Sequence, residues 1–168
     1  MSLFVPDWVF DKFSDITPEF LKKNNIEAIV SDIDNTLVTY DDEKPTDDVL
    51  SWLGSLEKAG VKIAFVSNNS HERVRIFNES LGFFAIGKSG KPFKKNIIEA
   101  MEYMGVPYEN VIMLGDQIFT DVLAGRSAGI RAALVPPIKD KTDPFTKFKR
   151  LLEKPILKSI KSQDFTNN

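Results

Sequence analysis

Short and nearly continuous apolar runs recur along the chain, separated by stretches in which apolar positions follow a helical spacing. Such runs are typical of parallel strands that are covered on both faces of a sheet. They predict about five strands, of which the third is weak, at Ile26–Ile33, Val61–Val66, Phe83–Ile86, Val111–Leu114 and Ala132–Val135.

The stretches between these runs predict helices, each followed by a glycine that favours a helix end. The predicted helices cover Thr46–Ala59, Ser70–Leu81, Phe93–Met104 and Thr120–Ala128. Strands that alternate with helices in this way indicate an α/β fold with a parallel sheet and right-handed crossovers. Beyond Pro137, residues 144–161 predict a basic amphipathic helix.

The composition narrows the chemistry that this fold can perform. The chain has 168 residues, which favours one domain, and it has no Cys and a single His, His71. This excludes disulfides, cysteine nucleophiles and thiolate metal sites, as well as any site that needs two imidazoles. Function must therefore rest mainly on carboxylates, hydroxyls, amides and lysine. We see no membrane span or secretion signal, so we expect a cytoplasmic protein.

Two carboxylates follow the first predicted strand. Asp32 and Asp34 are two residues apart, so they point to the same side of the sheet, where the carboxyl ends of parallel strands form a ligand crevice. Two acids this close repel each other unless a cation lies between them or one holds a proton. Mg²⁺ fits such a set of hard oxygen ligands. The alternative is a pair of solvated aspartates that cap the next segment.

Polar residues also follow the other predicted strands. Ser67 and Asn68 follow the second, Lys91 comes after the third, and Asp116 follows the fourth, with Asp121 close behind. One edge of the sheet would thus receive carboxylates, a hydroxyl, amides and a cation. Phosphoryl transfer needs this set, because its catalysis is mostly positioning and neutralisation of charge.

These motifs resemble, in order along the chain, those of the haloacid dehalogenase superfamily of phosphatases. They are Asp32-Ile33-Asp34-Asn35-Thr36-Leu37, Ser67-Asn68, Lys91-Pro92 and Gly115-Asp116-Gln117 with Thr120-Asp121. The resemblance spans about residues 29–135 and implies a Rossmann-like fold. The finer features look like subfamily IIIA, in particular its YqeG-type members, which are similar to the phosphatidylglycerophosphate phosphatases of mitochondria.

The resemblance implies a role for each acid at the strand ends. Asp32 would be the nucleophile that forms an aspartyl-phosphate, and Asp34 would protonate the leaving oxygen and then activate water. Mg²⁺ would be held by the Asp32 carboxylate, the backbone carbonyl of Asp34 and Asp116. An acid two residues after the nucleophile is typical of members that hydrolyse phosphate esters.

The remaining motif residues would support this chemistry. Ser67, with backbone amides near Asn68, would hold the phosphoryl group, and Lys91 would neutralise charge on both Asp32 and the phosphate. Asp121 would orient Lys91 or a metal-bound water. Thr36 and Gly115 would support the site, Gly115 by permitting a close backbone approach.

The spacing of the motifs also bears on the substrate. Each gap is filled by the helix and strand that the sheet requires, so no cap domain fits, and a small flap near Tyr40–Glu43 is the most that the first gap allows. An uncapped site stays open to bulky substrates. We expect a phosphatase domain at 1–138 and, at 139–168, a basic helix and tail beside the same domain.

The basic helix leaves two alternatives open. Its apolar stripe consists of Phe145, Phe148, Leu152, Ile156 and Ile160. This stripe either packs on the core, as such stripes usually do, or lies on an anionic membrane as a peripheral contact. In residues 1–138 acidic side chains outnumber basic ones, which argues against nucleic acid as a partner. The sequence does not indicate an oligomeric state.

The sequence as a whole predicts a Mg²⁺-dependent phosphomonoesterase, with phosphatidylglycerophosphate as the leading substrate by resemblance only. Two alternatives remain. One is a phosphatase for proteins, nucleotides or sugar phosphates. The other is a non-catalytic regulatory module that binds phosphate or Mg²⁺.

Overall fold

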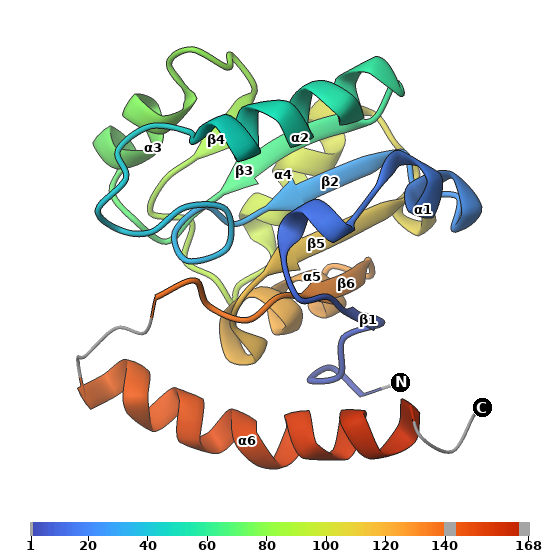
Figure 1. The fold of residues 1–168 in the computed structure, drawn as a ribbon, viewed down its shortest axis with the longest axis vertical. Helices are drawn as coiled ribbons and strands as arrows, with labels where there is room; N and C mark the ends of the chain where they lie inside the picture. The colour runs from blue at the N-terminus through green and yellow to red at the C-terminus, as the bar shows by residue number, and fades with distance from the viewer. Residues whose placement is uncertain (1, 140–143, 165–168) are drawn as a thin grey trace.

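The chain forms one sheet of six parallel strands in the order β1-β6-β5-β2-β3-β4 (Figure 1). The computed structural model describes residues 2–139 and 144–164. The strands are β1 (Trp8–Val9), β2 (Ala28–Ser31), β3 (Lys62–Val66), β4 (Phe84–Ile86), β5 (Val111–Gly115) and β6 (Arg131–Leu134). This confirms the predicted α/β class and all five predicted strands.

Helices connect the strands and lie on both faces of the sheet (Figure 1). They are α1 (Pro18–Lys23), α2 (Asp47–Lys58), α3 (His71–Asn78), α4 (Lys95–Met104), α5 (Leu123–Ser127) and α6 (Pro144–Asp164), with 3₁₀ turns at Phe13–Asp15 and Tyr108–Asn110. The start of α2 is capped by Thr46 and that of α3 by Ser70, each through a side-chain oxygen that accepts a backbone N–H. Gly105 ends α4 in a left-handed conformation at φ 64°.

Alternate residues of the strands build two cores, because side chains along a strand point to opposite faces. Ile29, Ile63 and Phe65 pack against α2 and α3 on one face. Val30 and Val66 pack against α4 on the other face. Since both faces are covered, the strands read as continuous apolar runs.

The strand order reverses between β2 and β5. From β2 the chain proceeds outward to β3 and β4, then returns to place β5 on the other side of β2. Ser31, the last residue of β2, is in register with Phe65 of β3 and Leu114 of β5, so these three strands end together. A ligand crevice is expected at such a switch point, outside the carboxyl ends of the strands.

Two elements differ from the sequence-based expectation. The edge strand β1 pairs with β6 but is only two residues long, which is too short to show a periodic pattern. The helix expected at Thr120–Ala128 begins earlier, as a π-helical segment, η3 (Ile118–Val122), that continues into α5. This wide turn brings Asp121 back toward the end of β5, where it accepts hydrogen bonds from the backbone N–H groups of Asp116 and Gln117.

Helix α6 lies alongside the β1–β6 edge of the molecule (Figure 1). Its buried contact differs from the predicted stripe: Glu153 is buried and accepts a hydrogen bond from the Ile118 N–H at 2.8 Å. Ile156 and Leu157 are partly buried against η3 and β6, whereas Phe148 and Leu152 are exposed. Only part of the apolar stripe therefore packs on the core. Across residues 2–139 and 144–164, no helix is long and apolar enough to cross a membrane.

Candidate active site

The switch point gathers the side chains that the sequence motifs single out. Asp32 directly follows β2, Ser67 follows β3, Lys91 lies in the loop after β4, and Asp116 follows β5. All four residues are buried. Parallel strands that end in register have thus brought polar groups from four separate segments to one edge of the sheet.

Lys91 joins two of the acids. Its Nζ donates to Asp32 Oδ1 at 2.9 Å and to Asp121 Oδ1 at 2.7 Å, and its side chain is only 2% exposed. Burial on its own would lower the pKa of Lys91, but the attraction of Asp121 and Asp32 outweighs burial and holds this pKa above its ordinary value. The lysine therefore stays charged and holds the Asp32 carboxylate in place.

Asp32, Asp116 and Asp121 form an acidic cluster, in which one carboxylate oxygen from each lies within 4.8 Å of the others. Asp121 is already engaged, because one oxygen accepts from Lys91 and the other accepts from two backbone N–H groups. Asp32 and Asp116 are bridged by the Thr36 hydroxyl, at 3.3 and 3.2 Å. A hydroxyl proton can satisfy only one of them at a time. The donor set thus fits a hard divalent cation between Asp32 and Asp116.

Gly115 permits this arrangement. A Cβ at this position would overlap the carboxylate of Asp121. The residue that ends β5 must therefore lack a side chain if Asp121 is to reach Lys91. The close approach expected at Gly115 is thus the approach of the Asp121 side chain to its backbone.

The side chain of Asn68 contacts the segment that carries Lys91. Its Oδ1 accepts from the backbone N–H of Lys91 and from the Ser89 hydroxyl, both at 2.8 Å, and its Nδ2 donates to the Lys91 carbonyl at 3.0 Å. The side chain thus positions the loop that carries Lys91. The Ser67 hydroxyl, beside it, accepts the N–H of Asn69 at 3.1 Å.

Two further residues contact the site that sequence reasoning did not assign to it. Asn69 Nδ2 donates to Asp34 Oδ2 at 2.8 Å, and Arg73 contacts Asp34 Oδ1 at 2.9 Å. The available signal was Ser70: as the cap of α3, it places Arg73 in the first helical turn, next to the end of β3.

Burial raises the pKa of Asp32 to about 6, although Lys91 opposes the shift. If Asp32 is the nucleophile that the resemblance implies, it acts only as the ionised carboxylate, so turnover should then fall as the pH drops below about 6 at low Mg²⁺. A bound cation favours the ionised form, so saturating Mg²⁺ should move this acid limb to lower pH. Rate profiles against pH at two Mg²⁺ concentrations measure the shift, and identical acid limbs would contradict it.

The same pKa has a consequence for stability with a definite sign. The folded chain binds the Asp32 proton more tightly than the unfolded chain does. The stabilising contribution of this group is therefore fully present below about pH 4 and is lost as the pH rises through about 6.

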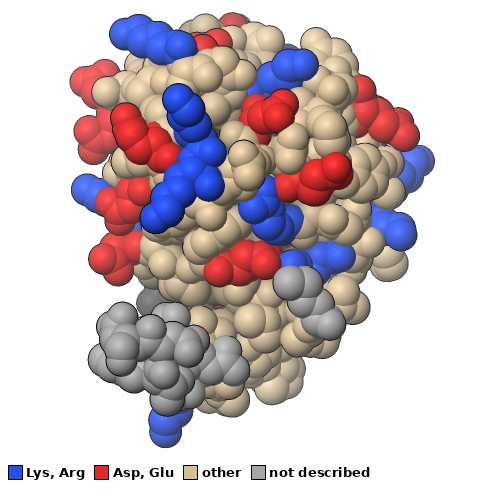
Figure 2. Space-filling view, turned by 90° about the vertical axis from the view of Figure 1, so that its right-hand side faces the viewer, with Lys and Arg blue, Asp and Glu red and all other residues tan. Residues whose placement is uncertain are grey.

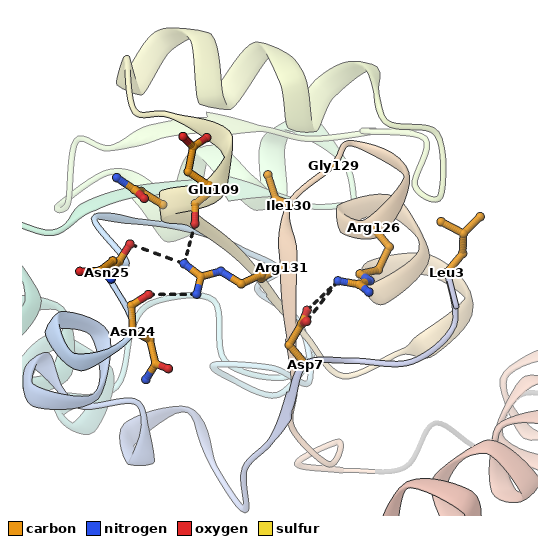
Figure 3. Close-up of a pocket in the computed structure, with 10 residues that line it drawn as sticks. Leu3, Asp7, Asn24, Asn25, Glu109, Arg126, Gly129, Ile130 and Arg131 are labelled. Carbon is orange, nitrogen blue, oxygen red and sulfur yellow. Dashed lines mark hydrogen bonds and ion pairs between the residues drawn. The ribbon is translucent and has the colours of Figure 1, made fainter. Parts of the chain in front are cut away.

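A hollow at the opposite end of the sheet shows a different chemistry (Figure 3). Within it, Arg126 contacts Asp7 at 3.0 Å, and Arg131 donates to the carbonyls of Asn24 and Glu109. Figure 2 views the side of the molecule at the right of Figure 1, where acidic and basic residues are interspersed. The contacts of Arg126 and Arg131 connect segments near the starts of the strands. The site formed by Lys91 with Asp32 and Asp121 lies at the other end of the sheet.

Comparison with known proteins points to one family. Residues 20–129 match the family model of the haloacid dehalogenase-like hydrolases. The chain is 37% identical over 158 residues to the probable phosphatase YqeG of Bacillus subtilis, with 94% of this chain and 92% of the relative covered.

Solved structures agree on the fold. The cobalt-bound deoxy-D-mannose-octulosonate 8-phosphate phosphatase YrbI of Haemophilus influenzae has a TM-score of 0.54 and 19% identity, covering 67% of this chain and 69% of its own. An uncharacterized protein from Listeria monocytogenes has a TM-score of 0.55 and 18% identity, covering 71% of this chain and 85% of its own. At these identities the likeness concerns the fold alone.

Proposed function

This chain belongs to the haloacid dehalogenase-like hydrolases and is a phosphatase, and we propose that it hydrolyses phosphate monoesters with Mg²⁺ through a phosphoaspartate on Asp32. The observation that carries the proposal is the buried Lys91, whose ammonium group holds the Asp32 carboxylate at the switch point, opposite Asp116. A nucleophilic carboxylate needs such a fixed cation to stay ionised beside a phosphate.

The reaction divides into two steps at the same carboxylate. An Asp32 oxygen attacks phosphorus, the bond to the ester oxygen breaks, and Asp34 gives its proton to the departing alcohol. Water then attacks the phosphoaspartate while Asp34 takes up the water proton, which releases phosphate and restores Asp32.

The other residues position and neutralise charge in both steps. Ser67 and the backbone amides after it bind the phosphoryl oxygens, and Lys91 offsets their charge. The Asp32 carboxylate, the Asp34 carbonyl and Asp116 are the groups that would hold Mg²⁺, which supplies further neutralisation of phosphoryl charge.

Turnover by the native chain tests this proposal. We expect hydrolysis of p-nitrophenyl phosphate that requires added Mg²⁺ and stops on chelation. Rapid acid quenching with ³²P-labelled acetyl phosphate should trap a protein-bound acyl phosphate that hydroxylamine releases. Metal-independent turnover, or turnover without a trapped phosphoenzyme, would contradict the mechanism. Binding of phosphate and Mg²⁺ without turnover would favour the non-catalytic regulatory module.

For the substrate we favour an accessible lipid phosphate, with phosphatidylglycerophosphate as the leading candidate. The segment that carries Lys91 also carries the most exposed of the large apolar side chains in the described residues, Phe93, at 77%. Lys88, Lys94 and Lys95 are exposed in the same segment. An exposed aromatic ring among lysines suits an amphiphilic anion. On α6, the exposed Phe148 and Leu151 with nearby lysines offer a second contact with an anionic membrane.

Phe93→Ser tests the lipid assignment. Burial of a Phe ring in lipid contributes about 1.5–3 kcal/mol, and about 1.4 kcal/mol corresponds to a factor of ten, so we expect the ratio of lipid phosphate hydrolysis to p-nitrophenyl phosphate hydrolysis to fall by about tenfold to a hundredfold. The lipid substrate is presented in phosphatidylglycerol vesicles. Tyr103→Ser is the matched control, because Tyr103 is 70% exposed on α4 and stacks on Phe84 rather than flanking Lys91. An unchanged ratio in Phe93→Ser would favour protein, nucleotide or sugar phosphates.

A further inference from the structure

Arg73 contacts the Asp34 carboxylate through two of its nitrogens. Its Nε and Nη2 both donate to Asp34 Oδ1, at 3.2 and 2.9 Å, and its side chain is only 12% exposed. The other oxygen of Asp34 accepts from Asn69. Both oxygens of this carboxylate are therefore held by donors from the start of α3, which leaves its plane little freedom to turn.

The same guanidinium also holds the loop that follows the Asp32–Asp34 motif. Its Nη1 donates to the carbonyl of Glu43 at 2.7 Å, and its Nη2 donates to the carbonyl of Asp42 at 2.6 Å. A turn closed by Asp42 Oδ2, which accepts from the Thr39 hydroxyl at 2.7 Å, shapes the loop on its own side. Within the described residues, this loop occupies the place of the small flap that the sequence predicts.

Few side chains can make these contacts together. A guanidinium has five N–H donors in a planar fork, whereas the ammonium of lysine is a single point of charge. The carbonyls of Asp42 and Glu43 hold the Arg73 guanidinium from the side of the loop, and the guanidinium in turn holds the Asp34 carboxylate. Arg73 thus links the loop at residues 40–45 to the carboxylate expected to protonate the leaving group.

We propose that Arg73 is a positioning residue of the reaction, which orients the Asp34 carboxylate toward the leaving oxygen and uses the backbone of the 40–45 loop as its anchor. The inference rests on the proposed function and deepens it. It assigns to Arg73 and the loop the alignment of the proton donor, and it leaves phosphate binding and nucleophilic attack to other residues.

This role predicts a selective defect in Arg73→Met. The kcat/KM value reports steps up to formation of the phosphoenzyme, so it depends on Asp34 only when the leaving alcohol needs a proton. For benzyl phosphate, whose alcohol is basic, we expect kcat/KM to fall about 100-fold, in the range that general acid catalysis supplies. For p-nitrophenyl phosphate, whose leaving group needs no proton, we expect kcat/KM to fall by about threefold or less.

Two variants bracket the result. Arg73→Lys should recover part of the benzyl phosphate activity, because lysine can donate to Asp34 but cannot span the loop carbonyls as well. Arg75→Met is the matched control, since Arg75 lies on the same helix, is 59% exposed and contacts Glu72 and Glu79 instead. It should leave both substrates unaffected. If Arg73→Met does not fold, the Arg73→Lys comparison carries the test.

Cleavage after Glu43 by a glutamate-specific protease tests the anchor separately. Loss of the hydrogen bonds to the carbonyls should speed this cleavage about tenfold in Arg73→Met. Equal losses on the two substrates, or unchanged cleavage, would overturn the inference while the enzyme still works. No hydrolysis of either substrate by the native chain would instead overturn the proposed function and this inference together.

Discussion

Asp32→Asn is expected to lower Mg²⁺-dependent hydrolysis of p-nitrophenyl phosphate by about 10⁴-fold or more, because an amide cannot form the phosphoenzyme. The substitution keeps the shape of the side chain, and its Oδ1 can still accept from Lys91, which lies 2.9 Å from the present oxygen. The loss would therefore be chemical rather than structural. Initial rates with and without Mg²⁺ measure it.

The stability of the same variant provides its control. Burial disfavours the charge on Asp32, as its raised pKa shows, so replacing it by a neutral amide removes a cost of folding at neutral pH. We expect Asp32→Asn to unfold at the same temperature as the native chain or higher. A variant that retains a tenth of the native rate would refute the nucleophile assignment, and one that melts earlier would refute the account of its burial.

Lys91→Met is expected to destabilise the fold as well as reduce turnover. The lysine ammonium is buried between Asp32 and Asp121, and its removal leaves two carboxylates without the cation that pairs them. Breaking a buried ion pair on one side costs about 3–5 kcal/mol. Activity should fall about 10²–10³-fold, the loss seen when one preorganised charge-stabilising group is removed. Urea unfolding and p-nitrophenyl phosphate hydrolysis measure the two effects.

A double variant separates these effects. Adding Asp121→Asn to Lys91→Met removes one of the stranded charges and keeps the oxygen that accepts from the Asp116 and Gln117 N–H groups. We expect it to recover more than half of the lost free energy of unfolding and none of the lost activity. Equal stability of the single and double variants would show that repulsion around Lys91 is not the source of the loss.

The pattern of the chain was sufficient to predict the central strands and the edge of the sheet at which chemistry gathers. Asp32, Ser67 and Asp116 each follow a buried strand, and the rule that parallel strands end on one side places them together. The sequence did not predict β1, because its two residues form a strand only by pairing with β6. The family is confirmed, and the individual roles of the site residues stay predictions.

The contacts around Asp34 show where sequence reasoning stopped. Arg73 follows Asp34 by 39 residues. It belongs to helix α3, which also carries the exposed charged residues Glu72 and Arg75. The Ser70 cap places Arg73 in the first turn of α3, but the sequence pattern does not show that Arg73 contacts Asp34 while Arg75 pairs with Glu72 at the surface. The difference arises from the path of the 40–45 loop, which passes over Arg73 and supplies two carbonyls.

By itself the sequence determined the alternation of strands and helices, the absence of cysteine chemistry and the set of polar residues at the strand ends. These follow from local periodicity and from composition, which need no knowledge of distant contacts. Only the tertiary structure decided how each acid is used: Lys91 links Asp121 to Asp32, Asn68 holds the Lys91 loop, and Arg73 holds Asp34. Hydrogen bonds act over about 3 Å and in fixed directions, so they depend on how segments far apart in the chain are placed against one another.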